Sequence, residues 1–418
     1  MRSCARLSAQ TEKEREVRVV ILAEGFTKMM GYTENNLPKA LALLGHEVHV
    51  VTTNLQANYR TPDYRDIYES FLGPVEQPCG TEILDGYALH RLPHAKPLGY
   101  ARIRGLTKKL RSLRPDVVQA LAVASWIPLE AALARRSVGY RLFTGAHQTA
   151  SVFPKVVKEG SRWCAARLKS DVRRALPGRI VSFFSEKCYA ATVDCAEIAE
   201  KYYGVPKQKI DVCPIGVDTD LFRPADDHRS EQARTRLRES LGFEASHIVC
   251  IYTGRFSEAK NPLCLAQAVR SLVAQGEPYR GLFIGDGPQA DAIAVCDGCA
   301  IRSFVPWARL AEFYRAADIG VWPTQESMSM LDATACGLPT VVSDRLRAVE
   351  RVEGNGLTYR EGDPADLSRA LISLKATDDR QRLGRYGSEK IRRHFSWIKI
   401  AERRLRDYEA AVGRPASG

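Results

Sequence analysis

Short apolar runs recur along the chain, and each is followed by a loop and then by a helical pattern. In the N-terminal half, residues 17–23 form a β-rich apolar run, a loop with Gly25 and Gly31 follows, and a helical pattern covers about 33–44. The next apolar run is 46–52. Strand, glycine loop, helix and strand make a βαβ unit, whose parallel strands are buried on both faces. The pattern therefore predicts a parallel sheet covered by helices.

The second half repeats this alternation after about residue 214. Apolar runs typical of strands alternate there with helical patterns, at 248–252, 282–284, 319–322 and 340–342. Such alternation predicts a second parallel sheet. Because 418 residues are too many for one ordinary hydrophobic core, two domains are expected. The predicted fold class is α/β, with two Rossmann-like domains.

A proline-bounded segment separates the two series, and its Gly216 permits unusual backbone angles. The charged residues near the C-terminus have a helical pattern. The predicted segments are a polar N-terminal extension, a first domain, a linker, a second domain and a C-terminal helix that packs back on the first domain: residues 1–16, 17–213, 214–224, 225–396 and 397–418.

The composition is typical of a soluble globular protein, with 45% hydrophobic and 26% charged residues. Residues 1–18 lack the apolar core of a signal peptide, and no run is long enough to span a membrane. The 11 cysteines are scattered and lie mostly in apolar runs, which favours a cytoplasmic location. Cys296 and Cys299 form a single CxxC with no histidine or second pair beside it, so a metal or redox role is disfavoured.

The net charge of +12 is concentrated in two stretches of the first half. Residues 96–114 carry +7 and residues 151–190 carry +6, so the remainder of the chain is about neutral. A localised basic surface favours an anionic partner, such as a phospholipid surface or a phosphorylated acceptor, although a solvated helix face explains it equally well. No helix-turn-helix, zinc-finger or RNP pattern accompanies the charge, so nucleic acid is not expected.

Two groups of charged residues in the second half suggest a ligand. Arg255 and Lys260 follow the apolar run 248–252, and a guanidinium fork and an ammonium group suit phosphate oxygens. Glu326 and Asp332 come later, and carboxylates accept hydrogen bonds from sugar and ribose hydroxyls. Cations for a diphosphate and carboxylates for hydroxyls together indicate a nucleotide-sugar site.

Five motifs, in order, resemble those of the retaining glycosyltransferases of family 4. They are Pro214-Ile-Gly-Val-Asp-Thr-Asp-Leu-Phe-Arg-Pro224, Gly254-Arg-Phe-x-x-x-Lys260, Gly285-Asp-Gly-Pro288, Ala317-Asp318 and Asp332-Ala-x-Ala-Cys-Gly-Leu-Pro339. The resemblance covers about 17–397 and implies the GT-B architecture, in which two Rossmann-like domains with parallel sheets face each other across a cleft. Because a fold alone does not give a function, the site residues must carry the inference.

The resemblance implies roles for several residues of the second domain. Arg255 and Lys260 would grip the donor diphosphate and stabilise the charge that develops on the leaving group. Asp332 would hold the ribose hydroxyls, Glu326 would contact the donor sugar, and Val305 would line the base pocket. The family usually has two glutamates separated by seven residues, whereas five residues separate the two acids here. The chain therefore has a shortened loop at this point.

Further roles are implied at the cleft. Ser327, Met328 and Ser329 would begin the next helix, where free backbone amides can reach phosphate oxygens, although a serine here can also be only an N-cap. His147 follows an apolar run, and the family places a histidine against the donor sugar and phosphate. Gly31 matches the glycine loop beside the diphosphate. In the family the leaving phosphate is described as taking the acceptor proton, so no side-chain base is implied.

The resemblance thus predicts retaining transfer of a hexosyl unit from a UDP- or GDP-sugar to a hydroxyl acceptor. The stretches 96–114 and 151–190 favour a lipid-linked or phosphorylated acceptor and a peripheral position on the inner face of the membrane. Asp218-Thr-Asp220 resembles a metal motif of another glycosyltransferase fold but lies in the linker, so no metal and no cofactor is expected. A small soluble acceptor and a catalytically silent nucleotide-sugar-binding protein remain alternatives.

Overall fold

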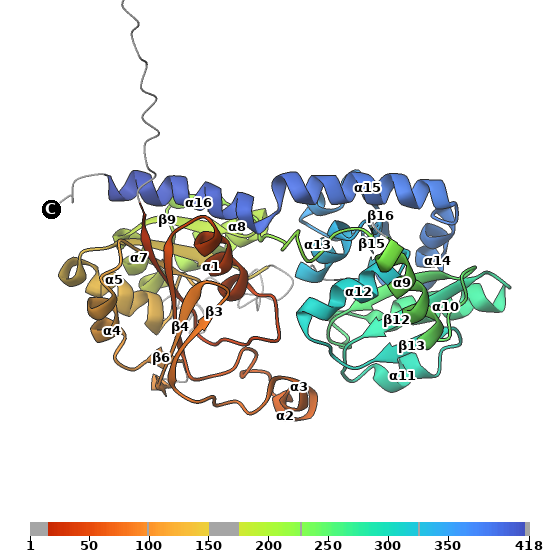
Figure 1. Cartoon of the computed structure of the whole chain (residues 1–418), viewed down its shortest axis with the longest axis horizontal. Helices are drawn as coiled ribbons and strands as arrows, with labels where there is room; N and C mark the ends of the chain where they lie inside the picture. The colour runs from red at the N-terminus through yellow and green to blue at the C-terminus, as the bar shows by residue number, and fades with distance from the viewer. Residues whose placement is uncertain (1–15, 98–99, 150–174, 226–227, 325–326, 414–418) are drawn as a thin grey trace, which may run out of the picture.

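Two α/β domains lie side by side in the computed structural model (Figure 1). The structure describes five stretches of the chain, residues 16–97, 100–149, 175–225, 228–324 and 327–413. Each domain is a sheet with helices packed against it, and α15 (Thr377–His394) and α16 (Trp397–Val412) run along one side of both domains. The α/β fold class with two Rossmann-like domains is confirmed.

The first domain contains an eight-stranded sheet in the order β10-β9-β8-β7-β1-β2-β4-β3. Its neighbouring strands pair in parallel except β3 and β4, which form an antiparallel hairpin at one edge. Asp85 and Gly86 join them with φ values of +44° and +85°, the backbone of a tight hairpin turn that the sequence analysis missed. The strands are β1 (Arg18–Leu22), β2 (Glu47–Thr53), β3 (Gly80–Leu84), β4 (Tyr87–Leu92), β7 (Val117–Ala120), β8 (Arg141–Ala146), β9 (Ser185–Ala190) and β10 (Ile210–Val212), with a separate pair β5 (His94–Ala95) and β6 (Arg102–Ile103).

Helices cover both faces of this sheet. Because successive side chains of a strand point to opposite faces, Val19 and Ile21 of β1 join the core under α1 and α16, whereas Val20 and Leu22 join the core under α4 and α5. The helices are α1 (Thr33–Leu43), α2 (Tyr64–Ile67), α3 (Glu69–Leu72), α4 (Leu106–Leu113), α5 (Trp126–Val138), α7 (Leu176–Phe184) and α8 (Val193–Tyr203).

The second domain contains a six-stranded parallel sheet in the order β13-β12-β11-β14-β15-β16. The central strand β11 is buried along its whole length, as its apolar run predicts. The strands are β11 (Ile248–Thr253), β12 (Tyr279–Ile284), β13 (Cys299–Arg302), β14 (Ile319–Trp322), β15 (Thr340–Ser343) and β16 (Gly356–Tyr359). The helices are α9 (His228–Ser240), α10 (Pro262–Ala274), α11 (Ala290–Ala294), α12 (Leu310–Ala316), α13 (Met328–Ala335) and α14 (Pro364–Ser373).

The chain passes between the domains at two points that touch each other. The Val217 N–H donates to the Phe395 carbonyl at 2.7 Å, and the Trp397 N–H donates to the Val217 carbonyl at 3.0 Å. A Cβ atom on Gly216 would lie 2.7 Å from the Trp397 ring, so glycine lets the two passing segments pack closely. Residues of α16, among them Tyr408, belong to the first-domain core. The domain boundaries expected from the sequence stay predictions.

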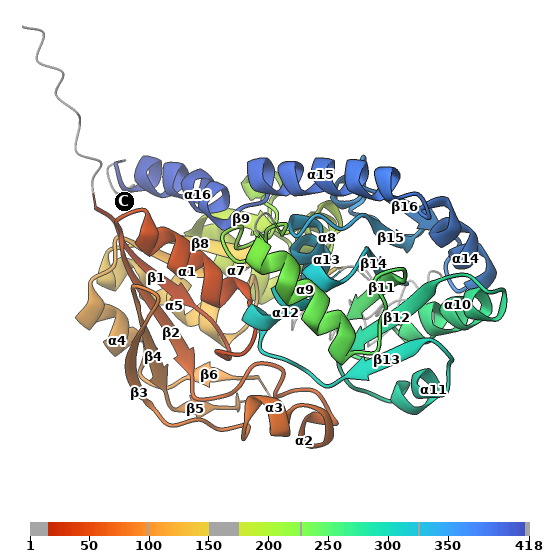
Figure 2. The same cartoon turned by 45° about the vertical axis from the view of Figure 1, so that its right-hand side comes forward.

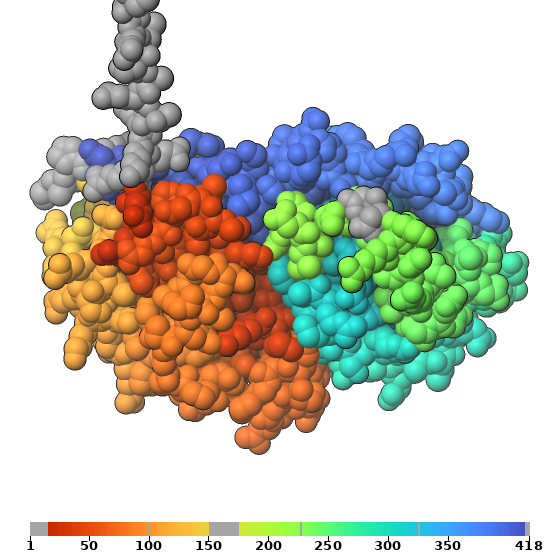
Figure 3. Space-filling model, viewed as in Figure 1, coloured from red at the N-terminus to blue at the C-terminus, as the bar shows by residue number. Residues whose placement is uncertain are grey.

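The α2–α3 segment, residues 63–72, projects from the lower part of the first domain (Figure 2). In the space-filling view the red to orange surface of the first domain meets the cyan surface of the second along a narrow seam (Figure 3). No helix in the described part of the chain combines the length and the apolar character needed to cross a membrane.

Candidate functional site at the domain interface

Two glycine loops meet at the carboxyl ends of β11 and β12. Gly254 and Arg255 directly follow β11, and Gly285 directly follows β12. A Cβ atom on Gly285 would lie 1.9 Å from the Gly254 carbonyl oxygen, so no larger residue fits there. Its φ of +151° also favours glycine. This packing fixes the backbone of Arg255 at the sheet edge where open α/β sheets bind their ligands.

The Arg255 guanidinium, predicted to grip a diphosphate, forms an ion pair with Asp63 of the first domain through Nη2 and Oδ2. Each side chain is 29% exposed. Arg255 Nε and Asp63 Oδ1 are both buried and have no hydrogen-bond partner among the described residues. A carboxylate of the first domain is therefore paired with the cation that the resemblance assigns to the donor diphosphate.

Lys260 lies in the turn that begins at Ser257, whose carbonyl accepts a hydrogen bond from the Lys260 N–H at 3.0 Å. The Thr324 hydroxyl donates to the Ala259 carbonyl at 2.6 Å and so ties the segment after β14 to this turn. Glu326, the predicted donor-sugar acid, comes two residues after Thr324 and lies outside the described residues. The roles of Lys260 and Glu326 stay predictions.

The helix α13 begins at Met328 with Ser327 at its N-cap position. The hydroxyls of Ser327 and Ser329 are 2.8 Å apart, and Ser329 Oγ also accepts from Trp322 Nε1 at 3.1 Å. The two hydroxyls are thus engaged within the protein. The Ser327 and Met330 N–H groups also have partners within this turn, so what the helix can offer a phosphate is the backbone N–H groups between them.

Asp332 lies in the next turn of α13 and is only 5% exposed. Its Oδ2 accepts a hydrogen bond from the Trp307 indole at 3.2 Å. Burial raises the pKa of the Asp332 carboxyl to about 8, and the indole hydrogen bond offsets part of that rise. The Trp307 ring also packs on Gly31 of the first domain, where a Cβ atom would lie 2.0 Å from the indole. Gly31 and Asp332, both assigned to the donor site, therefore meet with Trp307 between them.

Sequence reasoning missed two residues of this interface. They are Trp307 and Asp63, neither of which was predicted to belong to a site. Neither residue belongs to a sequence motif, and the contacts of both form only where the two domains meet. The one local signal was the position of Trp307 two residues after Val305, a half-buried residue that packs on the second-domain core.

His147 directly follows β8. Both ring nitrogens are buried without a hydrogen-bond partner among the described residues. A Cβ atom on Gly145 would lie 2.8 Å from His147 Nε2, so the ring folds back over the end of its own strand. Burial, helped by the charge of Arg404, lowers the pKa of His147 to about 4. The imidazole is therefore neutral at physiological pH, and its role toward a donor stays a prediction.

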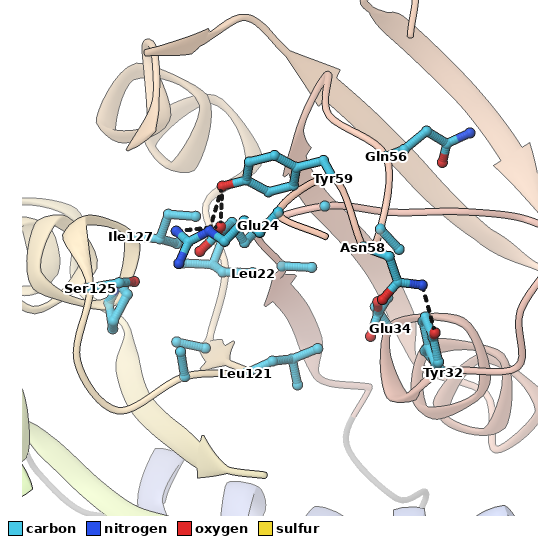
Figure 4. A pocket seen from close by; sticks show the side chains of 17 residues that line it. Leu22, Glu24, Tyr32, Glu34, Gln56, Asn58, Tyr59, Leu121, Ser125 and Ile127 are labelled. Atoms are coloured by element: carbon cyan, nitrogen blue, oxygen red, sulfur yellow. Dashed lines mark hydrogen bonds and ion pairs between the residues drawn. The ribbon is translucent and has the colours of Figure 1, made fainter. Parts of the chain in front are cut away.

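The first domain holds a cavity of about 320 Å³ at the carboxyl ends of β1, β2 and β7 (Figure 4). On one side, Glu24 accepts hydrogen bonds from Tyr59 and from Arg60, whose Nη2 lies 2.7 Å away. On the other side, Asn58 donates to the Tyr32 hydroxyl at 3.1 Å. Polar groups on two sides of an apolar floor suit a small molecule with several hydroxyls.

Glu34 lines the same cavity and lies in the first turn of α1, the helix that follows the Gly31 loop. Burial raises the pKa of the Glu34 carboxyl to about 7. Tyr32, which also lines the cavity, directly follows Gly31, and Gly31 packs on Trp307. This places a candidate acceptor pocket beside the candidate donor site.

The structure describes the first basic stretch almost completely and the second only in part. Residues 96–114 are covered except for 98–99, and Arg102 there pairs with Glu130 at 2.9 Å. Of the stretch 151–190, residues 151–174 lie outside the described part.

No cluster of three or more His, Cys, Asp or Glu side chains able to hold a metal occurs in the part of the chain that the structure describes.

The fold and the site together define a class. Two Rossmann-like domains with a cation and a buried acid on one side and a glycine loop on the other have the GT-B architecture of glycosyltransferases. Two family models match the chain, "Glycosyltransferase Family 4" over residues 35–221 and "Glycosyl transferases group 1" over residues 247–377. The chain belongs to this family of group 1, or family 4, glycosyltransferases.

Curated relatives carry the name D-inositol 3-phosphate glycosyltransferase. The protein of Xylanimonas cellulosilytica is 32% identical over 56% of this chain and 59% of its own length. That of Segniliparus rotundus is 29% identical over 67% of this chain and 63% of its own length. The chain thus spans about three fifths of the length of these relatives.

Solved structures of low sequence identity share the fold. Anabaena HepE in complex with UDP has a TM-score of 0.68 at 15% identity, with 94% of this chain and 100% of that protein covered. At this identity the likeness concerns the fold alone.

Proposed function

We propose that the protein transfers a hexosyl unit from a nucleoside diphosphate sugar to a hydroxyl acceptor, with retention of the anomeric configuration. The observation that carries the proposal is the meeting of Gly31, Trp307 and Asp332 at the domain interface. A sugar-nucleotide bound on the second domain at this point would face the cavity of the first domain, where an acceptor can sit. Domain interfaces are common places for such ligand sites.

The chemistry required of these residues is mainly electrostatic. When the bond between the anomeric carbon and the diphosphate breaks, negative charge accumulates on the leaving phosphate oxygens. Fixed cations at that place, Arg255 and Lys260, stabilise the transition state more than the ground state. Asp332 would accept hydrogen bonds from the ribose hydroxyls. The leaving phosphate would take the acceptor proton, and neutral His147 would position the donor sugar.

A uracil nucleotide is the favoured donor carrier. Anabaena HepE, which shares the fold, has been solved with UDP and with UDP-glucose. A GDP-sugar is the alternative. We expect the loop with Val305 to line the base, and no metal or cofactor is needed, because the protein cations can neutralise the diphosphate.

The favoured acceptor is a small phosphorylated polyol, as the names of the curated relatives suggest. The cavity of about 320 Å³ in the first domain has room for one such ring, and Arg60 at its wall is a cation able to approach a phosphate. A lipid-linked acceptor would need a membrane surface as well.

Two neighbouring helices of the first domain carry exposed apolar and basic side chains that would suit such docking. Leu133, Leu176 and Phe183 are 63%, 54% and 74% exposed on the adjacent helices α5 and α7. Arg136 and Arg179 are exposed on the same two helices. Exposed apolar and basic side chains on the same helices favour an anionic lipid surface.

Co-sedimentation tests this docking with vesicles of phosphatidylcholine alone and with phosphatidylglycerol added. The protein should bind the second kind, and Phe183→Ser should weaken binding while Val295→Ser, 76% exposed on the other domain, should not. Equal sedimentation with and without anionic lipid would rule the membrane role out.

The proposed activity is tested by mixing the protein with UDP-, GDP- and dTDP-sugars, myo-inositol 3-phosphate and other polyol phosphates, and measuring nucleotide release and product. Turnover with one donor is expected. Nucleotide binding without turnover for any acceptor would favour the catalytically silent alternative, for which the shortened Glu326–Asp332 segment is the motivating feature. No release and no thermal shift with any nucleotide would reject both.

A further inference from the structure

The α2–α3 segment of the first domain, residues 63–72, closes directly on the part of the second domain assigned to the donor. Asp63, at its beginning, pairs with Arg255. Further along, Tyr68 and Phe71 stack on Phe304 of the second domain, with ring centroids 5.4 Å and 5.7 Å apart. One ion pair and two ring contacts therefore hold this segment across the cleft.

The ion pair is incomplete on both sides. Only Nη2 of Arg255 and Oδ2 of Asp63 meet, although a guanidinium and a carboxylate can form two parallel hydrogen bonds. Arg255 Nε and Asp63 Oδ1 are left buried and without a hydrogen-bond partner among the described residues. A buried polar atom without a partner is unfavourable, so the contact is weaker than a complete pair.

Asp63 also has a second possible partner within its own segment. It occupies the N-cap position of α2, but its side chain makes no capping hydrogen bond there. Aspartate at this position normally accepts from the first free N–H groups of the helix. Released from Arg255, the carboxylate would be free to accept from N–H groups of this kind.

We propose that Asp63 is an internal competitor of the donor diphosphate, which pairs with Arg255 until a nucleoside diphosphate binds and displaces it. The inference rests on the proposed function, because it takes Arg255 as the diphosphate ligand. A diphosphate brings more charge and more acceptor oxygens than one carboxylate, and it can satisfy Nε as well as Nη2. The α2–α3 segment then keeps only its ring contacts and loosens.

This competition lowers the apparent affinity for the donor. When a ligand binds only one state of a protein and that state is only partly populated, the apparent affinity is reduced in proportion to its population. Partly exposed ion pairs shift such equilibria by about a factor of five. Neutralising Asp63 should therefore tighten binding of UDP, and of inorganic pyrophosphate, by about fivefold.

The test is calorimetric titration of UDP, GDP and pyrophosphate into the wild type, Asp63→Asn and Asp66→Asn. Asp66 is an exposed acid on the same short helix and does not pair with Arg255, so it controls for the change in local charge. Tighter binding by Asp63→Asn, with Asp66→Asn unchanged, supports the proposal. Unchanged or weaker binding by Asp63→Asn overturns it, while binding by the wild type still upholds the donor site.

If no variant binds any nucleotide, the proposed function and this inference both fail. Hydrogen exchange of the wild type gives a second measurement that needs no variant. On addition of UDP the amides of residues 63–72 should exchange faster, because their ion-pair anchor is lost. Slower exchange of this segment with UDP would overturn the proposal.

Discussion

The indole Nε1 of Trp307 donates a hydrogen bond to Asp332 Oδ2 at 3.2 Å, and the same ring packs against Gly31 of the other domain. A buried acid of the second domain is thereby covered by an aromatic ring that the first domain helps to hold. The covering explains why Asp332 keeps a hydrogen bond although it is removed from water. It also means that closure of the domains and the state of Asp332 depend on each other.

The buried Asp332 carboxyl should make stability depend on pH. Its pKa is about 8 in the folded protein against 3.8 when unperturbed, so the folded state binds the proton more tightly. Stability from this group is therefore greatest below about pH 4 and declines as the pH rises toward 8. Asp332→Asn removes the charge but keeps an oxygen for the indole.

We expect Asp332→Asn to be at least about 1 kcal/mol more stable than the wild type at pH 8, with a smaller difference at pH 5, in urea unfolding. Above pH 8, where Asp332 is ionised, the same variant should bind UDP about tenfold more weakly than the wild type, because an amide is a poorer acceptor for ribose hydroxyls than a carboxylate. Parallel stability curves for the two proteins would show that Asp332 is not the titrating group.

Gly31 should tolerate no side chain. A Cβ atom there would lie 2.0 Å from the Trp307 ring, so Gly31→Ala must push the indole away from its place between the domains. We expect a loss of about 1–3 kcal/mol of stability and reduced transfer. Gly80→Ala is the matched control, because nothing lies within 4 Å of a Cβ atom at that position. Thermal unfolding and activity that are alike in the two variants would contradict the contact.

Arg255 should matter for turnover far more than for folding. Its side chain is part of an incomplete ion pair, so Arg255→Ala should change unfolding by less than about 1 kcal/mol. Loss of a cation at the leaving group should lower kcat/KM by about 100-fold or more, equivalent to about 3 kcal/mol. Arg255→Lys should recover part of the activity, since it keeps the charge but not the fork. Near-normal kcat/KM in Arg255→Ala would remove this residue from the site.

His147 should act as a neutral group. Because its pKa in the folded protein is about 4, it does not titrate between pH 5 and 8, and kcat should show no inflection from it there. Its folded pKa lies below the unperturbed 6.5, so the stability that depends on neutral His147 is present above about pH 6.5 and is lost toward pH 4.

Because His147 is proposed to position the donor sugar, His147→Gln should lower kcat by about 10–100-fold. Because glutamine does not titrate, the variant should also lose less stability on acidification. Steady-state kinetics and urea unfolding at pH 5 and pH 7.5 measure the two effects. A kcat inflection near pH 6.5 that disappears in the variant would show that the imidazole does titrate.

The fold could be predicted because its signals are local. The apolar runs at 17–23 and 248–252 became β1 and β11, and Gly45, with φ +90°, follows the first helix. The antiparallel β3 was not expected, because a hairpin at the edge of a parallel sheet depends on one short turn at Asp85 and Gly86.

The site was only partly predictable for a physical reason. Arg255, Asp332 and Gly31 belong to local motifs, and the structure brings Gly31 and Asp332 to the same ring. Asp63 lies 192 positions from Arg255 along the chain, so no local sequence pattern could indicate their contact. Trp307 likewise gains its role only from the opposite domain.

A crystal structure of the protein with UDP tests the donor site most directly. We expect to find the diphosphate on Arg255 in the place of Asp63, and the ribose hydroxyls within hydrogen-bond distance of Asp332. UDP bound elsewhere, or a complex in which Arg255 still pairs with Asp63 and Asp332 contacts only Trp307, would contradict it.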